Sequence, residues 1–315
     1  MAKVAIVGSG LIGRAWAISF ARAGHEVALW DAEDEAPAAA LGFIAGVLAE
    51  LAANDLLRGA TPAAVLARLH VARDLADALD GATHVQESTP EKLAVKRAVF
   101  ADLDRLAAAD AVLASSSSAL LPSAIFEGLA GRRRCLVVHP INPPYLVPAV
   151  EVVPSPATEP AVVARTAALM AEAGQAPIVM KREIDGFVMN RMQGALLEEA
   201  FRLVADGYAS VEDVDIGIRD GLALRWSFIG PFETIDLNAP GGVADYVARY
   251  HGLYANLHPA QRRRVDWTGP VLETVERERR TRLAADRLAA RQGWRDRRLM
   301  ALIAHKRRAG EDIGD

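Results

Sequence analysis

The chain has one cysteine, Cys135, among 315 residues. A single thiol excludes an internal disulfide, and because it stands in an apolar stretch we expect a buried, inert side chain. Positive charge is not in excess either: the formal net charge of -4 argues against nucleic acid as the main partner. The arginines of the stretch from Glu276 to Arg308 alternate with acids and apolar residues at helical spacing, which predicts a solvated amphipathic helix.

Long hydrophobic segments are scarce as well. No apolar run reaches the roughly 18 residues that a membrane-spanning helix needs. No cationic leader with an apolar core precedes the first apolar stretch. We therefore expect a soluble, cytoplasmic protein with no membrane partner. Internal repeats and low-complexity linkers are also missing, and typical domains of roughly 100–200 residues predict that the chain holds two domains.

The first half of the chain alternates short apolar strands with helical stretches. This alternation indicates an α/β fold with a doubly wound, mainly parallel Rossmann-type sheet. An insert at residues 36–69 is long enough for a protruding pair of helices. The predicted strands are Val4–Val7, Val27–Trp30, His70–Ala72, His84–Glu87, Ala111–Ala114, Cys135–His139, Val150–Val153 and Ala176–Met180.

Beyond Asp185 the strand signal stops and only helical periodicity continues. We therefore place a domain boundary there, with residues 1–184 forming the sheet domain and residues 185–315 forming an all-helical second domain. The predicted helix 187–206 is apolar nearly all round, which suits a buried helix or a subunit interface. The other predicted helices are 211–219, 232–237, 243–256 and 272–305.

A glycine-rich turn follows the first predicted strand, with the order Gly8-Ser-Gly10-Leu11-Ile12-Gly13. Gly8 permits the tight turn, Gly10 lets the backbone approach a pyrophosphate, and Gly13 lets helix and strand pack closely. The amides that open the next helix, including those of Leu11 and Ile12, face the phosphates together with the positive end of the helix dipole. The pattern indicates a dinucleotide site; a tight turn without ligand is the alternative.

An acid ends the second predicted strand, at about the separation from the glycines that a ribose-binding carboxylate has. This residue, Asp31, would accept hydrogen bonds from ribose hydroxyls and repel a 2'-phosphate. Three further acids follow, Glu33, Asp34 and Glu35, and no lysine or arginine stands beside them. The pocket is therefore predicted to take NAD rather than NADP, and no metal.

Polar side chains stand at the predicted carboxyl ends of later strands, where a doubly wound sheet binds its ligands. The serines at 115–118 follow one such strand; capping of the next helix is their alternative role. His139 ends another and has the pKa range for acid–base chemistry, although a lone histidine is more often structural. Glu151 lies in an otherwise apolar strand and needs a partner. The proline-rich loop between them can fold the two strands together, which predicts an imidazole–carboxylate pair.

Two further polar residues stand in the predicted helical domain. Asp185 is placed to cap its first helix, which puts Asn190 in the first turns. Arg225 is the single cation of an apolar, aromatic segment, 221–231. Pairing with a surface acid is the simpler role for such an arginine.

These motifs together resemble the L-3-hydroxyacyl-CoA dehydrogenase family. The glycine turn, the serine cluster, His139-Pro-Ile-Asn-Pro, Glu151 and Asp185-Gly-Phe-Val-Met-Asn-Arg occur in the family's order. Within the family, the segments that begin at His139, Glu183 and Arg225 are similar to the branch that acts on L-gulonate. The likeness extends to about residue 256.

The resemblance implies roles for single positions. His139 corresponds to the general acid/base, and Glu151 to the carboxylate that orients it. Ser118 and Asn190 correspond to residues that hydrogen-bond the substrate oxygen. Glu91 and Lys96 correspond to cofactor-side residues, although both could equally be exposed helix charges. The family also implies NAD as cofactor and a homodimer.

The expected activity is oxidation of the 3-hydroxyl of a small L-3-hydroxy acid of the L-gulonate type. Arg225 supports a free carboxylate on that substrate, because a guanidinium binds carboxylates bidentately. Three alternatives stay open. One is a short-chain 3-hydroxyacyl-CoA dehydrogenase, with Arg58 and Arg68 as phosphate contacts. Another is carnitine dehydrogenase, with Trp226 or Tyr145 facing the trimethylammonium. The last is a non-catalytic NAD-binding protein with a structural role.

Overall fold

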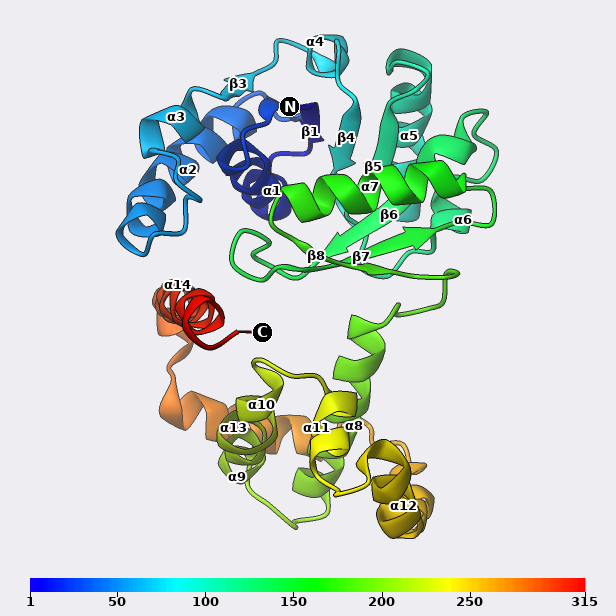
Figure 1. Cartoon of the computed structure of the whole chain (residues 1–315), viewed down its shortest axis with the longest axis vertical. Helices are drawn as coiled ribbons and strands as arrows, with labels where there is room; N and C mark the ends of the chain where they lie inside the picture. The colour runs from blue at the N-terminus through cyan, green and yellow to red at the C-terminus, as the bar shows by residue number, and fades with distance from the viewer. Residues whose placement is uncertain (315) are drawn as a thin grey trace. The chain divides into compact units, whose positions relative to one another are not determined.

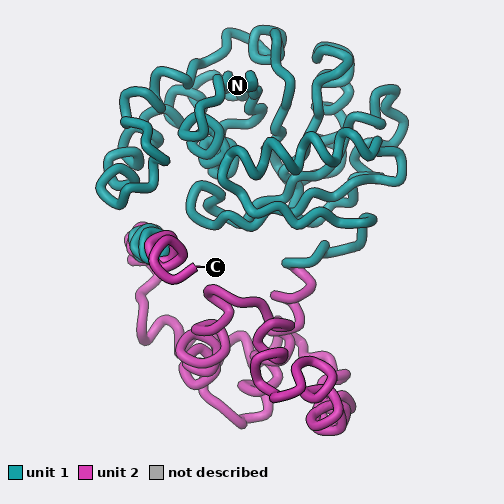
Figure 2. Tube along the Cα trace, viewed as in Figure 1, with its two compact units in different colours: residues 1–189, 296–305 teal, residues 190–295, 306–315 magenta. Residues whose placement is uncertain are grey.

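The computed structural model describes residues 1–314 and divides into two compact units (Figure 2). Unit 1 holds Met1–Met189 and Asp296–His305, and unit 2 holds Asn190–Arg295 and the residues from Lys306 on. The sequence-based boundary at 184/185 therefore differs from the structural one by a few residues. Segment 296–305, which we expected in the helical domain, joins unit 1 because Met300 and Ala304 are buried in its apolar core.

Unit 1 is built on one eight-stranded sheet with the order β3-β2-β1-β4-β5-β6-β7-β8. All neighbouring strands are parallel except β6 and β7. This confirms the doubly wound, mainly parallel α/β fold. The strands are β1 (Lys3–Val7), β2 (Glu26–Trp30), β3 (Leu69–Val71), β4 (His84–Glu87), β5 (Val112–Ser115), β6 (Cys135–Pro140), β7 (Ala149–Pro154) and β8 (Ala176–Val179).

Helices cover both faces of this sheet (Figure 1). Alternate residues of a strand point to opposite faces. Accordingly Val4 and Ile6 of β1 pack with one apolar cluster, which includes residues of α1, α2 and α7, while Ala5 and Val7 pack with a second, which includes residues of α5 and α6. The helices are α1 (Leu11–Arg22), α2 (Ala36–Ala53), α3 (Pro62–Leu66), α4 (Leu75–Leu79), α5 (Leu93–Leu106), α6 (Pro122–Ile125) and α7 (Pro160–Glu172), with a 3-10 turn at Arg132–Arg134.

Helix α2 is the one described helix that is long and apolar enough to cross a membrane, with a mean hydropathy of 1.7. The expectation that no segment reaches that length is therefore corrected. The composition has another explanation in the fold, because Ala40, Ile44, Leu48 and Leu51 recur every three or four residues and are buried in the core of unit 1. A helix with one such face is typical of a domain surface.

The described residues of unit 2 form helices joined by turns, with no strand among them. The helices that follow β8 are α8 (Met189–Ala205), α9 (Val211–Ile216), α10 (Ala223–Trp226), α11 (Pro231–Leu237), α12 (Gly242–Gln261), α13 (Pro270–Arg282) and α14 (Leu288–Ile313), with a π turn at Gly217–Leu222 and a 3-10 turn at Ala285–Arg287. Met189 of α8 and Asp296–His305 of α14 belong to unit 1. The helix predicted at 272–305 is broken: Leu283 and Ala284 are extended, with ψ values of 106° and 149°. Neither is glycine or proline, so the sequence carries no local signal for this break.

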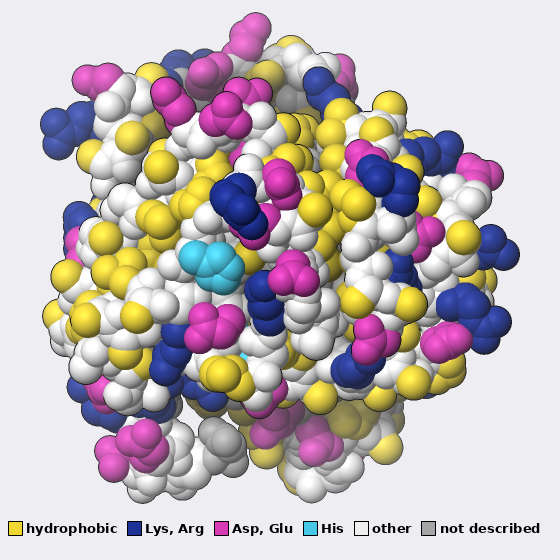
Figure 3. Space-filling model, turned by 90° about the horizontal axis from the view of Figure 1, so that it is seen from above, with side chains coloured by type: hydrophobic (Ala, Val, Ile, Leu, Met, Phe, Trp, Pro, Cys, Tyr) yellow, Lys and Arg dark blue, Asp and Glu magenta, His cyan; other side chains and the backbone are white. Residues whose placement is uncertain are grey.

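Charged side chains of both signs are interspersed over the face of the molecule in Figure 3. No patch of one sign dominates that face. The absence of a nucleic-acid partner stays a prediction from the net charge of -4.

Candidate active site

The glycine-rich turn between β1 and α1 is shaped as its motif predicts. Gly8 has a φ of +93°, and a Cβ on it would lie 2.8 Å from the Ser88 carbonyl carbon. A Cβ on Gly13 would lie only 1.8 Å from the Gly8 carbonyl oxygen, so neither position accepts a side chain. A Cβ on Gly10 would meet nothing within 4 Å. The open space at Gly10 is therefore where a pyrophosphate can approach the backbone.

The first turn of α1 also fits an anion. Its N-cap, Gly10, supplies no side-chain hydrogen bond, and the turn holds no acidic residue. The first amides of a helix have no partner within it, so those of Leu11 and Ile12 are left to bind an external acceptor. Together with the space at Gly10, this turn suits the pyrophosphate of a dinucleotide.

Asp31, directly after β2, lies against the same turn. Its Oδ2 accepts hydrogen bonds from the Ser9 amide at 2.6 Å and from Ser9 Oγ at 3.2 Å. Its Oδ1 accepts one from the Glu33 amide at 3.1 Å. The carboxylate is thus held beside the glycines, where it would meet an adenosine ribose and repel a 2'-phosphate.

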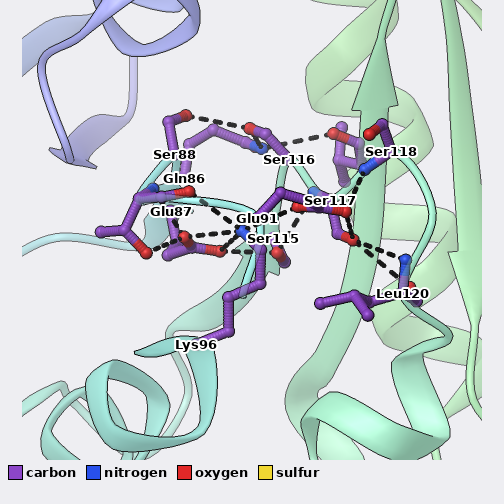
Figure 4. Close-up of polar contacts among 12 residues, drawn as sticks. Gln86, Glu87, Ser88, Glu91, Lys96, Ser115, Ser116, Ser117, Ser118 and Leu120 are labelled. Carbon is purple, nitrogen blue, oxygen red and sulfur yellow. Dashed lines mark hydrogen bonds and ion pairs between the residues drawn. The ribbon is translucent and has the colours of Figure 1, made fainter. Parts of the chain in front are cut away.

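Lys96 and Glu87 form a buried ion pair next to the loop that follows β4. Lys96 Nζ donates to both oxygens of Glu87 at 2.9 and 3.0 Å, and to the Thr89 carbonyl at 3.3 Å. Both side chains are fully buried, and Ser115 Oγ also donates to Glu87 (Figure 4). Lys96 is therefore not an exposed helix charge: it fixes the loop from inside the protein. Its assignment as a direct cofactor contact stays a prediction.

Glu91 organises the serine loop after β5. Its Oε1 accepts hydrogen bonds from Ser117 Oγ at 2.6 Å and from the amides of Ser118 and Ala119 at 3.0 Å each (Figure 4). Burial alone would raise the pKa of Glu91, but these hydrogen bonds and the Lys96 charge outweigh it, so the net pKa is lowered. The carboxylate thus stays ionised and shapes the loop that presents Ser118, which is exposed.

Ser116, in the same loop, belongs to a polar network that the sequence did not reveal. Its Oγ accepts hydrogen bonds from Trp16 Nε1 at 3.1 Å and from Gln86 Nε2 at 2.7 Å, and lies 3.0 Å from Ser88 Oγ. Gln86 in turn contacts His84 Nε2 at 3.0 Å. The network links α1, β4 and the serine loop through side-chain hydrogen bonds.

The predicted imidazole–carboxylate pair is present in unit 1. His139 and Glu151 are register partners on the antiparallel strands β6 and β7. His139 Nδ1 lies 2.7 Å from Glu151 Oε2, and only 6% of His139 and 0% of Glu151 is exposed. With Nδ1 facing the carboxylate, Nε2 is the ring nitrogen left to exchange a proton with a substrate.

The second oxygen of Glu151 is held by backbone that the sequence did not single out. Oε1 accepts hydrogen bonds from the amides of Val188 and Met189 at 2.6 and 2.9 Å. The residue before them, Phe187, has a φ of +49° and is fully buried. A left-handed conformation costs a residue with a side chain roughly 1–2 kcal/mol. No sequence pattern that we used predicts a phenylalanine in that region.

Two candidate residues belong to unit 2. Asn190 is the second residue of α8, directly after the amide that binds Glu151, and it lines a cavity of about 710 Å³ within unit 2. Arg225 lies exposed on α10, and its Nη1 donates a hydrogen bond to Asn238 Oδ1 at 3.4 Å. Within residues 1–314 Arg225 has no acidic partner, so the simple surface ion pair is not found.

The parallel strands bring the unit 1 candidates to one edge of the sheet. The glycine turn follows β1, Asp31 follows β2, the Glu91 loop follows β4, the serine loop follows β5, and His139 lies near the end of β6. Carboxyl ends of parallel strands share an edge, which is where such sheets bind ligands. The described residues contain no cluster that could hold a metal ion.

Comparison with known protein families identifies the family of this chain. Residues 3–184 match the family described as 3-hydroxyacyl-CoA dehydrogenase, NAD binding domain, and residues 186–275 match its C-terminal domain. The chain belongs to the 3-hydroxyacyl-CoA dehydrogenase family. It is therefore an NAD-dependent dehydrogenase that acts on CH–OH groups. The glycine turn and Asp31 lie within the matched NAD-binding domain, and their role in holding the dinucleotide stays a prediction.

Individual members of the 3-hydroxyacyl-CoA dehydrogenase family resemble the chain along most of its length. It is 45% identical to the lambda-crystallin homolog of Bos taurus over 306 residues, which are 96% of this chain and 95% of that one. It is 41% identical to L-carnitine dehydrogenase of Streptomyces griseus over 243 residues, 77% of this chain and 71% of that one. The solved structure of the NAD+ dependent 5-formyl-3-hydroxy-2-methylpyridine 4-carboxylic acid 5-dehydrogenase superposes with a TM-score of 0.82 at 27% identity, covering 97% and 99% of the two chains.

Proposed function

We propose that this dehydrogenase oxidises the 3-hydroxyl of a small L-3-hydroxy acid of the L-gulonate type. The observation that carries the proposal is the buried contact between His139 Nδ1 and Glu151 Oε2, at the carboxyl edge of the sheet. A histidine held in this way has one nitrogen committed and one available for acid–base work.

The reaction needs an acceptor on each side of one carbon. NAD, when bound, accepts the hydride from C3 of the substrate. His139 Nε2 takes the hydroxyl proton, and the electron pair of the O–H bond completes the carbonyl. Glu151 stabilises the imidazolium that results and fixes its tautomer. In the reverse direction the same imidazolium returns the proton to the oxygen.

Hydrogen-bond donors to the substrate oxygen complete the proposal. Ser118 is exposed on the loop that Glu91 shapes, and Asn190 follows the turn that binds Glu151. Donors placed on an oxygen whose charge changes during the reaction lower the barrier. We assign both residues to this role.

Arg225 supports a substrate with a free carboxylate. Its guanidinium is exposed and lacks an acidic partner among residues 1–314. An available guanidinium forms charge-assisted hydrogen bonds to a carboxylate. The relative with the 0.82 TM-score acts, by its name, on a carboxylic acid.

Two alternatives receive less support from the structure. The arginines considered for CoA phosphates are engaged with backbone, Arg58 with the Glu172 carbonyl at 2.7 Å and Arg68 with the Ala21 carbonyl at 2.9 Å. Of the aromatic residues considered for carnitine, Tyr145 is 4% exposed and lies within the apolar core. Trp226 is the aromatic candidate that is left.

A substrate panel tests the proposal. Formation of NADH or NADPH is followed with L-gulonate, L-3-hydroxybutyrate, L-carnitine and L-3-hydroxybutyryl-CoA, each with NAD and with NADP. We expect the highest kcat/KM with a free acid other than carnitine and with NAD. A higher value with the CoA thioester or with carnitine would replace the proposed substrate. No turnover of any member would favour a structural, non-catalytic role.

We also propose a homodimer formed through unit 2. Helix α12 exposes an apolar stripe with alternating steps of four and three residues, Val243, Val247, Tyr250, Tyr254 and Leu257. That spacing is the seam by which helices pair. Light scattering should give a dimer for the wild type and for Ala248→Glu, which is off the stripe, and a monomer for Val247→Glu. A monomeric wild type, or a dimeric Val247→Glu, would contradict the proposed interface.

A further inference from the structure

The turn at Gly186–Met189 contacts both members of the His139–Glu151 pair. The Phe187 ring packs against the His139 ring, with centroids 5.7 Å apart and planes inclined by 54°. The next two amides, of Val188 and Met189, donate to Glu151 Oε1. One short turn therefore fixes the carboxylate through its backbone and borders the imidazole through its side chain.

The backbone of this turn favours a different residue type. Glycine reaches a positive φ without steric cost, and asparagine tolerates it, whereas phenylalanine is strained there. Phe187 has a φ of +49° and no exposed surface. Backbone geometry alone therefore does not account for a phenylalanine at this position. The strained backbone conformation places the Phe187 ring against the His139 ring.

A single hydrogen bond does not fix the plane of an imidazole. The contact of His139 Nδ1 with Glu151 Oε2 sets one point of the ring and leaves rotation about that contact free. The Phe187 ring, packed beside it, restricts this rotation. Rotation would carry Nε2 away from the substrate hydroxyl, because Nε2 lies across the ring from Nδ1.

We propose that Phe187 is a positioning residue that holds the His139 ring in the plane needed for proton transfer at Nε2. The inference rests on the proposed function, in which His139 is the acid/base. Phe187 touches neither substrate nor cofactor in this scheme, and it acts through the imidazole. The two amides after it hold Glu151 in register with the same ring.

The test compares two buried phenylalanines of one apolar cluster. Phe187 and Phe126 are both in the second cluster of unit 1, and Phe126 packs on Phe100 at 4.8 Å. Phe187→Leu and Phe126→Leu remove the same atoms from similar surroundings, so a loss of packing lowers Tm in both. Phe187→Leu should lower kcat about ten-fold or more, with KM and the Kd for NADH unchanged. Phe126→Leu should leave kcat within about two-fold.

A second measurement does not depend on turnover. Proton spectra of protein labelled at its seven histidines should show a downfield imidazole N–H signal from the His139 contact with Glu151, identified by its loss in His139→Gln. The signal should survive in Phe126→Leu and be weakened by exchange with water in Phe187→Leu. Equal kcat in the two leucine variants together with an unchanged signal overturns the inference.

The two measurements separate this inference from the proposed function. If the wild type turns over no 3-hydroxy acid while Phe187→Leu alone loses the N–H signal, the proposed function fails and the positioning of the ring stands. If the wild type is active and Phe187→Leu equals Phe126→Leu in both measurements, the proposed function stands and Phe187 is only a core residue.

Discussion

His139 and Glu151 face each other across the antiparallel pair β6 and β7, with Nδ1 and Oε2 2.7 Å apart. Among the described strands this is the one antiparallel pair of the sheet. Antiparallel pairing brings β7 back along β6, so residues separated by twelve positions become register partners. The antiparallel direction of β7 therefore places the Glu151 carboxylate beside the His139 imidazole.

Glu151→Gln should reduce turnover strongly without unfolding the protein. The two backbone donors, Val188 and Met189, would attract the single amide oxygen, which leaves the amide NH2 facing His139 Nδ1. Nδ1 must then accept, so the ring proton moves to Nε2, the wrong tautomer for a base. We expect kcat to fall roughly 10²–10⁴-fold. NADH titration should give an unchanged Kd, and a kcat near wild type would refute the role of the carboxylate.

Arg225→Ala should weaken binding of a free acid. Loss of a charge-assisted hydrogen bond predicts a fall in kcat/KM of roughly ten-fold to a hundred-fold, mainly through KM. Arg249→Ala is the matched control, because Arg249 is also exposed in unit 2 but is paired with Asp245 at 2.7 Å. Steady-state kinetics with the best acid substrate compares the two variants. Equal values would remove Arg225 from the substrate site.

Asp31→Asn should relax the choice between NAD and NADP. The change keeps an acceptor for Ser9 and removes the charge that repels a 2'-phosphate. We expect the ratio of the Kd values for NADPH and NADH to fall about ten-fold, as one like-charge contact of about 1 kcal/mol or more predicts. Fluorescence titration measures both values. Glu50→Gln, at an exposed acid of α2, serves as control, and a similar change there would contradict the assignment to Asp31.

His84 should make stability fall in mild acid. Burial lowers its pKa from 6.5 to about 4, against a smaller raising effect of the hydrogen bond with Gln86. Below about pH 6.5 His84 is protonated in the unfolded chain, whereas in the folded protein it stays neutral until the pH nears 4. The contribution of the neutral imidazole to the free energy of unfolding is therefore complete above pH 6.5 and is lost as the pH falls toward 4. The loss amounts to about 3 kcal/mol.

His84→Leu removes this contribution whatever its effect on absolute stability. Urea unfolding between about pH 7 and pH 4.5 should give a shallower decline of the free energy of unfolding in the variant than in the wild type. Because all carboxylates are common to both proteins, the difference between the curves isolates the imidazole. Parallel curves would show that His84 is not held neutral by burial.

The sheet and its ligand edge could be predicted from local patterns. Strand periodicity located all eight strands to within one or two residues. The positions of Gly8 and Gly13 predicted the tight turn and the close helix–strand packing that the structure has there. The closeness of His139 and Glu151 followed from two apolar strands joined by a proline-rich loop. These features are local in sequence, or depend on one strand reversal.

Other parts of the site depend on contacts that no local pattern encodes. Lys96 has the sequence context of an exposed helix charge, and only the buried carboxylate of Glu87 explains its position. Glu91 shapes the serine loop from a different strand connection. Phe187 adopts a conformation that its side chain disfavours, because tertiary packing overrides it. The break at Leu283 likewise follows no breaker residue.

The most direct test of the account is His139→Gln, measured by single-turnover hydride transfer and by NADH binding on the same preparation. We predict a loss of transfer rate of roughly 10²–10⁴-fold with an unchanged Kd for NADH, because the imidazole exchanges the proton and the glycine turn binds the dinucleotide. Hydride transfer at the wild-type rate in His139→Gln would contradict the account.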